Sequence, residues 1–191
     1  PDWCAIHATH MTAAETRALA MTGAVAGLCP VTEANLGDGI FAASDWLGAG
    51  GGYGVGSDSN VAVGLVQELR LLEYSQRLKA GGRNMLADTF DSTGRSLFEH
   101  VQKGGNRAAG VSSMLEVGAE ATFVALDLDT PSLSHRRHDD LLDAWIFGHD
   151  RSPVAFVVVN GREVVRNGTH VDRQAVAGRY RQVLGRLLSA L

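Results

Sequence analysis

The chain has 191 residues, of which 45% are apolar, 20% are charged and 23 are glycine, and its formal net charge is −4. This composition is typical of a globular α/β protein and excludes a disordered or fibrous chain. The acidic balance argues against a nucleic-acid partner, because proteins that read nucleic acid are usually strongly basic. The sequence has no run of about eighteen apolar residues, so we expect no membrane span, and we expect no signal peptide.

Short apolar strands alternate with helices over the first eighty residues. We predict strands over 3–7, 24–29 and 53–56, and helices over 12–21, 40–47 and beyond Asp58. Thr12 and Glu15 have the spacing of a capping box, and residues 31–39 are predicted as a loop. Strands and helices in this order, with short connections, are typical of a parallel sheet that is covered on both faces.

The pattern changes after about Ala80. We predict a helix over 94–109, a strand over 121–127, a hairpin over 157–165 and an amphipathic terminal helix over 171–191. Asn160-Gly161 is the two-residue turn expected for the hairpin. These elements indicate a small antiparallel sheet followed by a helix.

The two cysteines, Cys4 and Cys29, lie in apolar runs. We expect both to be reduced thiols of a cytoplasmic protein rather than parts of a disulfide framework. The chain starts at Pro1 without a methionine and enters a strand almost at once. From this start we expect the chain to be part of a longer protein.

His7 and Asp58 each stand at the carboxyl end of a predicted strand. This is where an α/β barrel places its catalytic groups, and a carboxylate there can bind a divalent cation. A helix N-cap is the alternative interpretation of Asp58, since Ser-Asp-Ser is good capping composition. A structural role is the alternative for His7, because lone histidines are more often structural than catalytic.

Other candidate sites are weaker. His10 lies near the capping box and is predicted as a loop residue. The run His135-Arg-Arg-His138-Asp139-Asp140 could bind a metal, but no apolar framework surrounds it in the sequence. The glycine clusters at 48–52 and 104–105 lack the spacing of a dinucleotide-binding loop.

Four motifs resemble the formimidoylglutamate deiminases of the amidohydrolase superfamily. They are His7-Ala-Thr-His-Met-Thr12, Gly27-Leu-Cys-Pro-Val-Thr-Glu-Ala-Asn-Leu-Gly-Asp-Gly-Ile-Phe41, Gly56-Ser-Asp-Ser-Asn60 and Glu68-Leu-Arg-Leu-Leu-Glu-Tyr74. The second motif is the most specific. The resemblance implies an α/β fold in which residues 1–115 form strands six to eight of a metal-dependent (β/α)8 amidohydrolase barrel. Residues 116–191 would form part of a small β-sandwich and a terminal helix.

The resemblance also implies the chemistry of the site. Asp58 matches a strand-eight aspartate that binds one divalent metal, expected to be zinc, and takes a proton from the hydrolytic water. His7 matches a strand-six histidine that holds this water and polarises the carbon under attack. Glu33 and Asn35, together with Asp38, follow strand seven and are expected to shape the substrate pocket.

The implied reaction is hydrolysis of N-formimino-L-glutamate to N-formyl-L-glutamate and ammonia, a step of histidine degradation. The family carries three further metal ligands and an acid/base glutamate on strands one and five, which have no counterpart in the 191 residues. We therefore expect the chain to be inactive without the remainder of the barrel, and the complete enzyme to be a homodimer. Two alternatives stay open, namely another aminohydrolase such as a guanine deaminase-like enzyme, and a non-catalytic α/β interaction module.

Overall fold

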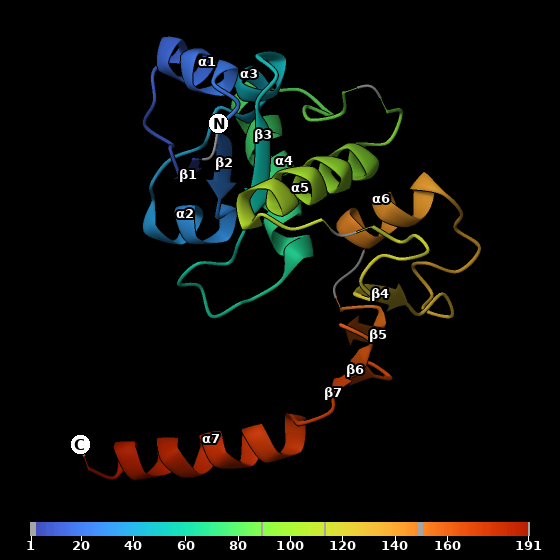
Figure 1. Ribbon diagram of the computed structural model, residues 1–191. Helices are drawn as coiled ribbons and strands as arrows, with labels where there is room; N and C mark the ends of the chain where they lie inside the picture. Colours follow the sequence, from blue (N-terminus) through green and yellow to red (C-terminus); the bar gives the residue numbers. More distant parts are fainter. Residues whose placement is uncertain (1–2, 89, 113, 149–150, 191) are drawn as a thin grey trace. The chain divides into compact units, whose positions relative to one another are not determined.

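The computed structural model describes residues 3–88, 90–112, 114–148 and 151–190. The chain divides into two compact units, one of residues 1–112 with 135–149 and one of residues 113–134 with 150–191. Each unit has its own sheet, and Figure 1 labels the helices and strands. No helix in the described residues is long and apolar enough to cross a membrane.

A three-stranded parallel sheet forms the centre of the first unit. Its order is β1 (Cys4–Ile6), β2 (Val25–Leu28) and β3 (Gly52–Val55). In the register, Ile6 pairs with Gly27, and Gly27 pairs with Gly54. The carboxyl ends of the three strands therefore meet at one edge of the sheet. Within the described ranges no strand pairs with the outer edge of β1 or of β3, as expected for a section of a barrel.

The helices of this unit are α1 (Ala13–Met21), α2 (Pro30–Leu36), α3 (Ala43–Gly48), α4 (Leu65–Ala80), α5 (Thr93–Ala109) and α6 (Asp139–Phe147). The predicted capping box is present, because Thr12 Oγ1 accepts the N–H of Glu15 while the Glu15 carboxylate accepts the N–H of Thr12. Helix α5 packs against β3, and α6 packs against α4 and α5. Most of the predicted helices and strands are confirmed to within a few residues.

The prediction of a loop over 31–39 was wrong, because α2 occupies most of it. Pro30 stands at the first helical position, where its fixed φ and missing N–H cost nothing. Gly37 ends the helix with a left-handed φ of 73°, a conformation that glycine adopts without strain. The segment was predicted as a loop because its composition is polar and contains glycine, although Pro30 and Gly37 are typical of the start and the end of a helix.

The core of the first unit lies between the sheet and its helices. Trp46, Tyr53, Leu69 and Leu97 are fully buried in it. Helix α5 approaches β3 so closely that a Cβ at Gly104 would overlap the backbone carbonyl of Tyr53. The glycine is therefore what permits this helix–strand contact.

The second unit contains an antiparallel sheet with the strand order β4 (Phe123–Leu126), β5 (Val154–Val159), β6 (Arg162–Arg166) and β7 (Thr169–His170), followed by α7 (Arg173–Leu188). The predicted hairpin is confirmed, since β5 and β6 pair across a turn in which Asn160 has a φ of 51° and Gly161 one of 75°. Positive φ at both central residues is the geometry of a type I′ turn. The boundary between two domains near residue 115 stays a prediction.

Candidate functional site

His7 and Asp58 lie at the same edge of the parallel sheet. His7 follows β1 directly, and Asp58 lies in the turn after β3, which ends at Val55. Strand β2 separates their two strands. Neighbouring strands run about 4.8 Å apart, so β1 and β3 are separated by about 10 Å. His7 and Asp58 therefore follow strands that are two positions apart in the sheet.

The backbone at both residues has a left-handed conformation. The φ angle is 63° at His7, 50° at Ala8 and 47° at Asp58. Such angles cost a residue with a side chain about 1–2 kcal/mol, and strain of this kind is concentrated at functional sites. Hydrogen bonds from the N–H of His7 to Gly27 O (2.9 Å) and from the N–H of Ala8 to Ile6 O (2.8 Å) hold the first turn in place.

The alternative interpretation of Asp58 as a helix N-cap is wrong. Helix α4 begins at Leu65, and its N-cap is Gly64. Asp58 is an exposed residue at the sheet edge.

The ring of His7 lies against a buried carboxylate. Nδ1 of His7 is 3.3 Å from Oε1 of Glu33, and the same oxygen accepts the backbone N–H of Cys29 at 2.8 Å. Glu33 is only 3% exposed. Its position in α2, which was not predicted, brings it next to a residue 26 positions earlier in the chain.

Cys29 follows β2 and is the N-cap residue of α2. Burial raises the pKa of its thiol to about 11, and the charges of Glu33 and Asp58 add to this effect. The thiol therefore stays protonated at neutral pH and is a poor nucleophile. Cys4 and Cys29 are both free, as predicted.

Glu68, the first residue of the fourth resemblance motif, is a buried acid for which no role was predicted. It is 1% exposed, its Oε2 accepts the N–H of Val31 at 2.9 Å, and its Oε1 has no hydrogen-bond partner among the residues that the structure describes. Burial raises the pKa of this carboxyl, and the charge of Glu33 raises it further. One signal could have revealed it, because Glu68 stands one turn before Leu72 on the buried face of α4.

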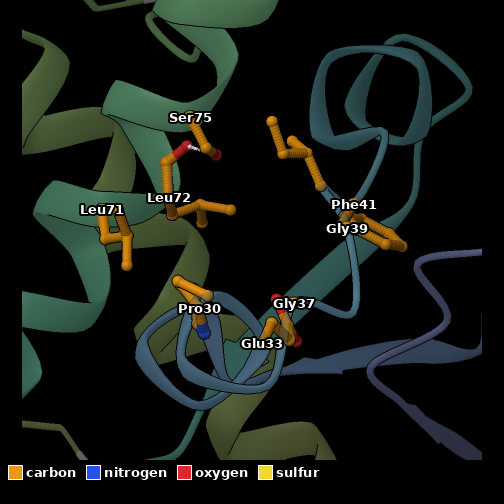
Figure 2. A pocket seen from close by; sticks show the side chains of 10 residues that line it. Pro30, Glu33, Gly37, Gly39, Phe41, Leu71, Leu72 and Ser75 are labelled. Atoms are coloured by element: carbon orange, nitrogen blue, oxygen red, sulfur yellow. Dashed lines mark hydrogen bonds between the residues drawn. The ribbon is translucent and has the colours of Figure 1, made fainter.

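Two pockets border the Glu33 region. One of about 400 Å³ is lined by residues that include His7, His10 and Asp38. The other, of about 280 Å³, is lined by Glu33 and by apolar side chains of the 39–41 segment and α4, as Figure 2 shows. Asn35 is exposed and lines neither of them, so its role in substrate binding stays a prediction.

The described residues fit only part of a metal site. Nowhere among them do three or more His, Cys, Asp or Glu side chains form a group that could hold a metal ion, and this includes the His135 to Asp140 run. A catalytic zinc ion needs about three protein ligands. The carboxylate of Asp58 is a suitable group for one of these ligands. The described residues do not supply the others.

The chain belongs to the amidohydrolase family, whose family model matches residues 2–164. It is 47% identical over 188 residues to the formimidoylglutamate deiminase of Pseudomonas aeruginosa, an alignment that covers 97% of this chain and 42% of that protein. It is also similar to a crystal structure of an amidohydrolase from Brucella melitensis, with a TM-score of 0.90 and 50% identity over 97% of this chain and 41% of the other.

A crystal structure of an adenosine deaminase from Xanthomonas campestris with bound zinc matches with a TM-score of 0.82 at 23% identity, over 97% of this chain and 42% of the other. At this identity the likeness concerns the fold alone. The predicted family and the predicted fold class, part of an amidohydrolase barrel, are confirmed. The chain spans about two fifths of the length of these relatives.

Proposed function

We propose that the complete protein containing this chain hydrolyses N-formimino-L-glutamate to N-formyl-L-glutamate and ammonia. The observation that carries the proposal is the 47% identity with formimidoylglutamate deiminase over 97% of the chain. The position of His7 and Asp58 at one edge of the sheet supports it, because catalytic groups of α/β barrels lie at the carboxyl ends of the strands.

In the proposed reaction, water adds to the formimino carbon, and Asp58 accepts the proton that the water loses. His7 holds the attacking water by accepting one of its hydrogen bonds and stabilises the tetrahedral intermediate. The carbon–nitrogen bond then breaks, and the nitrogen leaves as ammonia after it has been protonated. The exposed carboxylate of Asp58 and the ring of His7, which lines the 400 Å³ pocket, have the access that these roles need.

Asp58 would also supply one ligand to a divalent cation, for which we propose zinc. Zinc lowers the pKa of a coordinated water molecule to about 7. We propose that the other ligands, and the cationic groups that would pair with the two substrate carboxylates, come from residues outside this chain. Glu33 and Asn35 are proposed to shape the substrate pocket.

We further propose that the 191 residues are inactive alone, and that the complete protein is a cytoplasmic homodimer which acts in histidine degradation. The free state of Cys4 and Cys29 is in keeping with a reducing compartment.

The test is an assay of ammonia release by the complete, zinc-loaded protein, with N-formimino-L-glutamate and guanine as parallel substrates. We expect turnover of the first and none of the second. Turnover of guanine alone would support the other aminohydrolase, and turnover of neither would contradict the proposal. Asp58→Asn and His7→Asn should each lower kcat by about 100-fold or more, while Asp45→Asn in α3 serves as the matched control.

A further inference from the structure

The carboxylate of Glu33 contacts both the start of its own helix and the ring of His7. Its carboxylate accepts the N–H of Cys29 at 2.8 Å, and its own backbone N–H bonds to Cys29 O at 2.8 Å. The residue is 3% exposed and stands in the first turn of α2. Both ends of the residue are therefore tied to the carboxyl end of β2.

The partner of this carboxylate is equally constrained. The backbone of His7 is fixed by its hydrogen bond to Gly27 O and by a left-handed φ of 63°. Its Nδ1 lies 3.3 Å from Oε1 of Glu33. A carboxylate can only accept a hydrogen bond, so this contact requires that the proton of the neutral ring sits on Nδ1.

We propose that Glu33 is a positioning residue that fixes the tautomer and orientation of His7. With the proton on Nδ1, the ring presents Nε2 to the reacting groups. When Nε2 is protonated, the negative charge of Glu33 stabilises the resulting imidazolium ion, as the buried carboxylate of a catalytic triad does. The effect of Glu33 on catalysis rests on the function proposed above, whereas the contact between His7 and Glu33 is independent of that function.

A purely structural role is the competing explanation, since the hydrogen bond from Cys29 would by itself account for a buried acid at the start of α2. The variant that separates the two is Glu33→Gln. It keeps the size of the side chain and an oxygen that can accept the N–H of Cys29, but it removes the charge that faces His7. A structural role therefore predicts little change in this variant.

The experiment uses the complete protein that contains this chain, labelled with 15N-histidine. The ring nitrogens of His7 are assigned by the loss of signals in His7→Asn. In the unaltered protein, we expect the 15N shifts of the neutral ring to report a proton on Nδ1. In Glu33→Gln, we expect a mixture of tautomers, and in Glu33→Leu, we expect the Nδ1–H form to be lost.

Steady-state kinetics provide the second measurement. Removing a partner that orients a functional group typically lowers activity about 10–100-fold, so we expect kcat of Glu33→Gln to fall in this range while KM changes less than about two-fold. Asp45→Asn, which also removes an acid from the first turn of a helix in this unit, should leave kcat and the His7 signals unchanged.

The two proposals fail in different ways. If the unaltered protein does not hydrolyse N-formimino-L-glutamate, the proposed function fails, and the ring spectra still test the contact. If the protein is active but Glu33→Gln retains both kcat and the Nδ1–H tautomer, the positioning role is overturned.

Discussion

Oε2 of Glu68 on α4 accepts the backbone N–H of Val31 on α2 at 2.9 Å, although the two residues are 37 positions apart. The bond joins the start of α2, where Glu33 stands, to the first turn of α4. Oε1 of the same carboxyl is buried and has no hydrogen-bond partner within the described part of the chain. A charge on this carboxyl would therefore be destabilising, and the link stabilises the fold most when the carboxyl is neutral.

Glu68→Ala and Glu68→Gln should therefore differ in their effect on stability. The alanine variant leaves the partly buried N–H of Val31 without its acceptor, which costs about 1–3 kcal/mol. The glutamine variant keeps an acceptor for that N–H and removes the buried charge, so we expect a change within about 1 kcal/mol near neutral pH. Urea-induced unfolding measures both, and equal destabilisation by the two variants would contradict the prediction.

The same residue predicts a pH dependence. Burial raises the pKa of Glu68 above its ordinary value of 4.5, so the folded state binds this proton more tightly than the unfolded state does. The contribution of Glu68 to stability is then fully present below about pH 4.5 and is lost as the pH rises through the folded-state pKa. We expect Glu68→Gln to gain stability relative to the unaltered protein between pH 4.5 and pH 8. A stability difference that does not change with pH would show that the pKa is not raised.

The packing of α5 on β3 predicts opposite effects at two adjacent glycines. A Cβ at Gly104 would overlap the rigid backbone carbonyl of Tyr53, whereas a Cβ at Gly105 meets no atom within 4 Å. We expect Gly104→Ala to lower the free energy of unfolding by more than about 2 kcal/mol. Gly105→Ala should raise it by about 0.5–1 kcal/mol, because alanine is the better helix former. Thermal melts of the two variants give the comparison, and similar melting temperatures would contradict the observed helix–strand contact.

Glu73 is expected to be the most sensitive acidic residue of the first unit. It is 0% exposed, and its carboxylate accepts hydrogen bonds from Arg77 Nε (2.5 Å) and from the N–H groups of Met85 and Leu86 (2.9 and 3.0 Å). Glu73→Ala should destabilise the protein by about 3–5 kcal/mol, since it leaves the buried N–H of Leu86 and the partly buried donors of Arg77 and Met85 without this acceptor.

The control for Glu73 is Glu99→Ala. Glu99 also pairs with an arginine one helical turn away, Arg95, but at a partly exposed position. Its loss should cost less than about 1 kcal/mol. Chemical denaturation measures the free energy of unfolding of both variants. A larger loss of stability in Glu99→Ala than in Glu73→Ala would refute the expectation.

Metal content provides a further prediction. Since the described residues supply one suitable ligand, we expect the 191-residue chain to bind zinc at well below one equivalent after dialysis, and the complete protein to retain about one equivalent per chain. Metal analysis by mass spectrometry measures both. Tight, stoichiometric zinc in the isolated chain would show that these residues form a full site by themselves.

The sequence predicted the parallel strands and the two strand-end residues because these depend on local signals. Short apolar runs mark β1, β2 and β3, and the spacing of Thr12 and Glu15 marks the start of α1. The contact between His7 and Glu33 could not be predicted in this way. It requires the pairing of β1 with β2, and it also requires that the segment after Cys29 be helical, which its polar composition concealed.

The left-handed backbone at His7, Ala8 and Asp58 limits which substitutions can report on chemistry. Asparagine tolerates this conformation, so it changes the functional group and leaves the turn intact. Valine, isoleucine or threonine would strain the backbone and force the turn after the strand to rearrange. A loss of activity in such a variant would then not report on the imidazole or carboxylate that had been removed. Mutagenesis of these positions should therefore use asparagine and glycine. The exposure of a residue such as Asp58 does not by itself mean that the position tolerates many residue types.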